Sequence, residues 1–195
     1  MSNGKPWEDA PDLWKDEQAF MSKFLRSSIR KIWARHPIKH RYTANRVSVA
    51  VRQALEQDYP IGCKLSPQTK KLRQCEMCLL WWPVSKLQVD HLDGGYGYTT
   101  YTEMLSWMER MLWVGFDDIQ EICLDCHDKR NVMQKNNCEM WEVPYYKERT
   151  LFNQQKAAGM KRMLTAAGLP DGKNETERKA LYESYLQEKH YGKSK

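Results

Sequence analysis

Long apolar runs are absent from this chain of 195 residues. Its first residues, MSNGKPWEDAPDLWKDEQ, contain none, and no other segment approaches the roughly 20 apolar residues that a transmembrane helix needs. A secretory signal needs an apolar stretch of about 7–15 residues, so none is expected either. We therefore expect a cytoplasmic protein without membrane contact, in a reducing environment where its six cysteines bind metal or remain thiols.

Acidic residues are missing from one long stretch. From Gln18 to Leu55 there is no Asp or Glu, whereas the same stretch holds nine Lys or Arg residues and the whole chain has a net charge of +6. A solvated helix face usually mixes both signs, but a block of one sign attracts a polyanion such as nucleic acid. We therefore predict a DNA-binding extension here, with contacts from Arg26, Arg30, Lys31, Arg35, Lys39 and Arg41.

Internal repeats and low-complexity tracts are missing too, so each element must be inferred from its own pattern. Apolar residues recur at helical spacing from Leu13, and Pro37 is expected to end that helix. A second helix is expected from about Thr43 to Leu55. Alternation in LQVDHL predicts a short strand, and DIQEIC is expected to return as a second strand or a strand-like turn.

Three further helical patterns complete the chain. TYTEMLSWMERMLW predicts an amphipathic helix inserted between the two strands, and CLDCHDKRNVMQK predicts a helix after the second strand. Near the end, GLPDGKN separates two helices that weakly resemble a SAP-type DNA-binding hairpin, although a plain hairpin packed on the core is the alternative. The expected organisation is a loose arm (1–12), a basic helical extension (13–70), a core (71–135) with a helical insertion (99–114), and a C-terminal helical hairpin (150–195).

Two CxxC pairs, Cys75–Cys78 and Cys123–Cys126, indicate a metal site. The two-residue spacer lets both thiolates of a pair point into one tetrahedral site, and two pairs complete a four-cysteine shell. Because such a shell leaves no open position, we expect a structural Zn²⁺ rather than a catalytic one. A redox CxxC would need only one pair. The remaining cysteines, Cys63 and Cys138, are expected to be free thiols.

Asp90, His91 and His127 are metal-binding residue types that this zinc shell leaves unused. Neighbours on a strand face opposite sides, so Asp90 and His91 share a site only if the strand end bends, which Gly94 and Gly95 permit. His127 follows the second pair directly, near a helix start from which it can reach the strand. The alternative for His127 is a structural contact, such as capping its own helix.

The order CxxC, Asp-His, CxxCH resembles the HNH nuclease family. The insert WMERMLW followed by IQEICLDCHDKRN, and the stretch RSSIRKIWARHP from Arg26 to Pro37, look most like phage-encoded HNH endonucleases. This resemblance covers about residues 22–135. It implies a mainly α-helical protein with a small β-hairpin, in which a ββα-metal core is stapled by the four-cysteine zinc site and flanked by N- and C-terminal helical extensions.

The resemblance also implies a role for each matched residue. His91 would be the general base that takes a proton from the attacking water. Asp90 and His127 would hold one divalent cation, Mg²⁺, Mn²⁺ or Ni²⁺, against a non-bridging phosphate oxygen and the leaving 3′ oxygen. One position departs from the family: Asp118 stands where an asparagine normally braces the loop of the base. Ionised aspartate accepts but cannot donate, and it could instead attract the cation or raise the basicity of His91.

Three functions compete at this point. The leading one is a metal-dependent DNA endonuclease, a phage homing or genome-processing enzyme that acts on duplex DNA in the host cytoplasm. The second is a zinc-stapled nucleic-acid-binding or interaction protein with weak or no catalysis, and the third is an RNA-directed nuclease. A single ββα-metal site cuts one strand, so double-strand cleavage would need a homodimer or two events. A phage replication or packaging protein is a further candidate partner.

Overall fold

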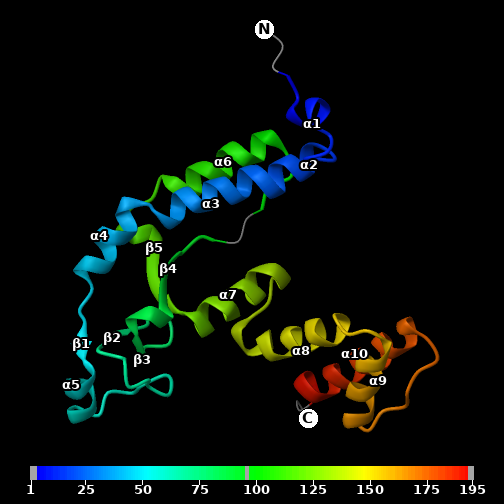
Figure 1. Ribbon diagram of the computed structural model, residues 1–195. Coiled ribbons are helices and arrows are strands. Elements are labelled where there is room, and N and C mark those ends of the chain that lie inside the picture. The colour runs from blue at the N-terminus through cyan, green and yellow to red at the C-terminus, as the bar shows by residue number, and fades with distance from the viewer. Residues whose placement is uncertain (1–3, 95–96, 193–195) are drawn as a thin grey trace. The chain divides into compact units, whose positions relative to one another are not determined.

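The computed structural model describes residues 4–94 and 97–192 (Figure 1). The chain is mostly helical with small antiparallel sheets, and it divides into two compact units, Met1–His127 and Asp128–Lys195. In the part of the chain that the structure describes, no helix has the length and apolar character needed to cross a membrane. Each unit has its own apolar core, so the two are considered separately.

The first unit begins with helices whose starts are set by capping residues. The Asp16 carboxylate accepts a hydrogen bond from the amide of Ala19 (2.7 Å), and His36 Nδ1 accepts one from the amide of Ile38 (3.3 Å). Pro37 occupies the first position of the helix that follows, where its fixed φ is favourable and its missing N–H costs nothing. The elements are α1 (Pro6–Asp9), α2 (Glu17–Ala19), the π-helical η1 (Phe20–Leu25), α3 (Arg26–Ala34) and α4 (Pro37–Asn45).

Two expectations for this region need correction. Helix α3 ends at Ala34, ahead of Pro37 as expected, but the helix expected from Thr43 to Leu55 does not form as one piece, because α4 ends at Asn45 and Val49 pairs with Leu72 in a strand. The β-branched residues around Val49 favour that pairing. Within the expected loose arm, Pro6–Asp9 is helical, while residues 1–3 lie outside the described part. The segments concerned are β1 (Val49–Ala50) and α5 (Val51–Glu56).

A three-stranded antiparallel sheet was not anticipated from the sequence. Its strand order is β1-β2-β3, with β2 at Lys71–Gln74 and β3 at Trp81–Pro83. Strands of two to four residues are too short to show an alternating pattern. The tight turn between β2 and β3 carries the first cysteine pair, so this sheet positions half of the predicted zinc site.

The predicted hairpin and the helices around it are present. Strand β4 (Leu87–His91) follows the short helix η2 (Val84–Lys86) and pairs antiparallel with β5 (Ile119–Cys123), with Leu87 opposite Cys123 and His91 opposite Ile119. The insertion between the strands contains α6 (Tyr101–Leu112) and η3 (Phe116–Asp118), and α7 (Leu124–Asn136) follows β5 directly. The local order is therefore strand, insertion, strand, helix.

Helix α6 lies along η1 and α3 in Figure 1. Its start is fixed by a capping box, in which Thr100 accepts from the Glu103 amide and the Glu103 carboxylate accepts from the Thr100 amide. The Tyr98 hydroxyl donates to the Met21 carbonyl (2.9 Å), which ties the insertion to the N-terminal helices. The shared apolar core consists of Met21, Ile29, Tyr98, Met104 and Trp107.

The second unit is a helical hairpin preceded by a helix that the sequence reading missed. A left-handed Gly168 (φ 73°) ends α9, and the Leu169 amide closes the turn on the Leu164 carbonyl (2.9 Å). Its core consists of Tyr145, Phe152, Met160, Leu164, Tyr182 and Leu186. The elements are η4 (Met140–Glu142), α8 (Val143–Asn153), α9 (Ala157–Ala166) and α10 (Glu175–Tyr191).

Candidate functional site

The four predicted zinc ligands come together in the first unit. The sulfur atoms of Cys75, Cys78, Cys123 and Cys126 all lie within 4.8 Å of one another. The first pair sits in the turn between β2 and β3, and the second sits at the junction of β5 and α7. Among the described residues, this is the only group of three or more His, Cys, Asp or Glu side chains placed to hold a metal ion.

Burial makes this cluster suited to a cation. Cys75 and Cys123 are fully buried, and the Cys123 amide donates to the Cys75 sulfur (3.3 Å). Desolvation raises the pKa of the Cys123 thiol to about 11 and also raises the pKa of Cys126. Several thiolates cannot be ionised side by side in such a place without a neutralising charge, and Zn²⁺ is the cation that prefers four sulfurs in tetrahedral geometry. The donor set therefore fits a structural zinc ion.

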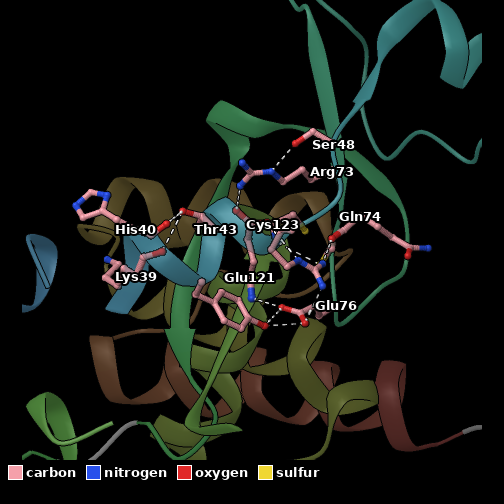
Figure 2. A network of polar contacts seen from close by, with 12 residues as sticks. Lys39, His40, Thr43, Ser48, Arg73, Gln74, Glu76, Glu121 and Cys123 are labelled. Atoms are coloured by element: carbon pink, nitrogen blue, oxygen red, sulfur yellow. Dashed lines mark hydrogen bonds and ion pairs between the residues drawn. The ribbon is translucent and has the colours of Figure 1, made fainter. Parts of the chain in front are cut away.

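A network of hydrogen bonds and ion pairs connects α4 and the residue after it to the cysteine cluster (Figure 2). Glu76, between the cysteines of the first pair, accepts from the Tyr42 hydroxyl (2.8 and 2.7 Å) and pairs with Arg46 (3.0 Å). Glu121 of β5, which is 2% exposed, pairs with Arg73 (2.8 Å), and its amide donates to the Glu76 carboxylate. Arg46 and Arg73 therefore form ion pairs within the fold, although both are basic residues of the N-terminal half.

Strand β4 and the first turn of α7 bring Asp90 and His127 together. Asp90 Oδ1 and His127 Nε2 lie 4.0 Å apart, and both side chains are partly exposed (22% and 32%). An octahedral Mg²⁺ holds each ligand at about 2.0–2.1 Å, so two ligand atoms up to about 4 Å apart can share one ion. Carboxylate plus imidazole is a donor set that Mg²⁺, Mn²⁺ or Ni²⁺ accepts. The pair fits a divalent cation.

The His91 side chain is buried against the N-terminal extension. Only 6% of the residue is exposed, and its ring centroid lies 4.1 Å from that of Trp33 on α3. His91 Nε2 lies 3.1 Å from the carbonyl oxygen of Met111, at the end of α6. A carbonyl oxygen only accepts, so the hydrogen of the neutral ring is on Nε2 and the lone pair is on Nδ1. The α6 insertion thus sets the tautomer that a base at Nδ1 requires.

Asp90 and His91 are consecutive but contact different neighbours. β4 stays paired with β5 through His91, so successive side chains alternate between the two faces. Their Cα atoms are about 3.8 Å apart, so the two side chains start from adjacent positions on opposite faces of the hairpin. The bend expected at Gly94 and Gly95 is not described as a whole, because Gly95 lies outside the described residues.

Asp118 supports the end of β4 through its backbone. Its carbonyl oxygen accepts a hydrogen bond from the Leu92 amide (2.8 Å), immediately after His91. Its carboxylate is exposed and accepts from the Gly115 amide (2.7 Å) within its own turn. The hydrogen bond from Leu92 therefore places the brace on the main chain at position 118, whichever side chain stands there.

A pocket of about 180 Å³ gives the buried imidazole an opening beside the end of β4. Trp113, one of its walls, is 87% exposed, which is unusual for an indole. The pocket is lined by His91, Leu92, Asp93, Arg110, Trp113, Val114, Asp117 and Asp118.

The six predicted DNA contacts are not equivalent. Arg26 donates to the Tyr98 carbonyl (3.0 Å) and its guanidinium lies 4.8 Å from the centre of the Tyr98 ring, so it serves the fold. Lys39 is half-buried beside Trp33. The four others, Arg30, Lys31, Arg35 and Arg41, are exposed. A groove of about 340 Å³ on this surface is lined by Ser22, Arg26, Ser27, Arg30, Lys31 and Ala34.

Three parts of the site were missed in the sequence reading. Trp33 forms the surface on which His91 rests, and the only signal was its place in RSSIRKIWARHP. The Met111 carbonyl has no sequence signal, because every residue carries a backbone carbonyl and only the fold determines which one lies beside His91. Glu76 could have been suspected from its position inside the first CxxC pair.

No protein-family model, curated protein or solved structure matches this chain.

Proposed function

We propose that this chain is a metal-dependent DNA endonuclease of the HNH type. The observation that carries the proposal is the 4.0 Å approach of Asp90 Oδ1 and His127 Nε2, next to an imidazole whose Nε2 is held by the Met111 carbonyl. The strand–strand–helix order of β4, β5 and α7 and the adjacent four-cysteine cluster support it. The zinc holds the fold, and the second cation belongs to the Asp90–His127 pair.

The residues of the site divide the chemistry between them. His91 Nδ1 takes the proton of the attacking water, while the Met111 carbonyl keeps the ring oriented through Nε2. Asp90 and His127 hold the divalent cation, which when bound supplies charge neutralisation at the scissile phosphate. The P–O3′ bond breaks, so the expected product ends are a 5′-phosphate and a 3′-hydroxyl.

Asp118→Asn is expected to leave the cleavage rate within about threefold of the parent. Asparagine keeps an oxygen that can accept from the Gly115 amide, and the Leu92–Asp118 backbone bond is unchanged by the substitution. The measurement is the cleavage rate as a function of Mn²⁺ concentration for both proteins. If Asp118 were a cation ligand, the variant would need a much higher Mn²⁺ concentration while keeping its fold.

Replacing Arg30 and Arg35 with glutamine is expected to weaken DNA binding and flatten its salt dependence. Each phosphate contact contributes about 0.9 to the slope of log K against log salt, so the slope should fall by roughly 1.8. The control is Lys71→Gln with Lys86→Gln, which removes the same charge from exposed positions elsewhere in the unit. Equal slopes for the two double variants would mean that the α3 surface does not contact DNA.

The experiment that tests the function is nicking of supercoiled plasmid by the zinc-containing protein with Mg²⁺, Mn²⁺, Ni²⁺ or EDTA. Cation-dependent nicking with 5′-phosphate ends is the expected result. Binding without nicking under every cation would instead favour a zinc-stapled DNA-binding protein, which the low exposure of His91 would suit. Competition between duplex DNA and RNA would show whether RNA is the preferred substrate.

A further inference from the structure

The Lys39 ammonium shares an aromatic support with the predicted base. Its Nζ lies 4.9 Å from the centre of the Trp33 ring, and the His91 ring centroid lies 4.1 Å from that same ring. Trp33 is buried against Val89 of β4 and Ile119 of β5, so its position is fixed by the core of the unit. One indole therefore places a cation and an imidazole at the same end of the β4–β5 hairpin.

Lys39 differs from the other basic side chains that the fold holds in place. Arg26, Arg46 and Arg73 are bound by carbonyl or carboxylate oxygens. Within residues 4–94 and 97–192, the Lys39 Nζ has no ion-pair partner within 4.0 Å and no hydrogen-bond acceptor, so its three N–H donors remain for an anion. Its half-buried position keeps it from extending freely into solvent.

The electrostatic surroundings of Lys39 connect it to the cation-binding pair. Desolvation lowers the pKa of Lys39, and the negative charge of Asp90 acts in the opposite direction. A cation–π contact contributes about 0.5–2 kcal/mol, which helps to offset the cost of keeping an ammonium group partly out of water. The Lys39 ammonium group therefore lies within the electrostatic reach of Asp90, the residue before His91.

We infer that Lys39 is a further catalytic residue, whose ammonium group binds the non-bridging oxygens of the phosphate that is cut. This inference rests on the proposed endonuclease function and adds a residue to the same site. Water attacks phosphorus, its proton passes to His91, the P–O3′ bond breaks, and the leaving oxygen gains a proton from solvent. Negative charge rises on the non-bridging oxygens during this step, and a fixed ammonium group stabilises it without reorganisation.

The test separates this role from an ordinary DNA backbone contact. Lys39→Met is expected to lower the single-turnover cleavage rate at saturating DNA by about 10²–10³-fold, as the loss of a preorganised charge donor does. The DNA dissociation constant should change by less than about tenfold, since only one phosphate contact is lost. Lys39→Arg keeps the charge and should recover part of the rate. Lys86→Met, at an exposed position outside the site and the DNA surface, should match the parent.

Each outcome bears on the inference. Circular dichroism and zinc content show whether each variant folds. If Lys39→Met does not fold, Lys39→Gln is used in its place. A variant that cuts at the parent rate at saturating DNA would overturn the catalytic role of Lys39. So would a loss that appears only in the dissociation constant. If the parent itself never cut DNA, the proposed function would fail first, and the inference would fail with it.

Discussion

Replacing His91 with alanine is expected to lower the rate of plasmid nicking by about 10²–10⁴-fold, the usual contribution of a general base. The reason is the contact of His91 Nε2 with the Met111 carbonyl, which puts the lone pair of the neutral ring on Nδ1. DNA binding should stay close to that of the parent, because His91 is 6% exposed and contributes little surface. Nicking rates and DNA dissociation constants measured for both proteins would show whether the rate falls while binding is kept.

Two further variants make that result specific. His91→Gln places an amide donor near the position of Nε2, where it can approach the Met111 carbonyl, but has no basic nitrogen, so it should lose activity like alanine while packing better. His40→Ala removes an exposed imidazole from α4 and should leave the rate unchanged. Parent-like cutting by both His91 variants would show that another group accepts the proton.

Cys75→Ser is expected to release the zinc ion and unfold the first unit. Cys75 is fully buried, and binding of a structural zinc contributes folding free energy directly, about 10–16 kcal/mol in zinc-finger peptides at neutral pH. Serine is a poor ligand for Zn²⁺ and would place an uncompensated hydroxyl among three thiols. Metal analysis should find one zinc ion per parent chain and much less in the variant, with loss of the cooperative thermal transition of this unit.

Cys63→Ser is the matched control for that experiment. Cys63 lies outside the four-cysteine cluster and is only partly buried, so its replacement should change neither zinc content nor thermal stability beyond about 1 kcal/mol. Parent protein without zinc, or a Cys75→Ser variant as stable as Cys63→Ser, would contradict a structural metal at this cluster.

The sequence predicted the parts of the fold that have strong local signals. The CxxC spacing predicted a cluster of four sulfurs, and alternation in LQVDHL predicted β4. Periodicity likewise predicted α6, because a dozen residues carry enough apolar repeats to define a helix. Helix α7 was expected as a continuation from the second cysteine pair. These signals belong to residues close together in the chain, where spacing alone decides which side chains share a face.

Contacts between distant residues could not be read in this way. Trp33 meets His91 across 58 positions because α3 and α4 pack on the hairpin, and basic composition alone suggested only a surface for DNA. The same composition did not distinguish Arg26, held by Tyr98, from the exposed Arg30. The end of α3 before Pro37 was predicted, but the helix that begins at Pro37 was missed, because a proline that stops one helix is also favourable at the first position of the next.

The most direct measurement of the central claim is the rate at which supercoiled plasmid is nicked by zinc-loaded parent and by His91→Ala, each with Mn²⁺ and with only zinc present. We expect nicking only by the parent with Mn²⁺, with the other three combinations at background. Such a pattern would require both the added cation and the His91 imidazole. Equal nicking by parent and variant, or no nicking by a parent that binds the plasmid, would contradict it.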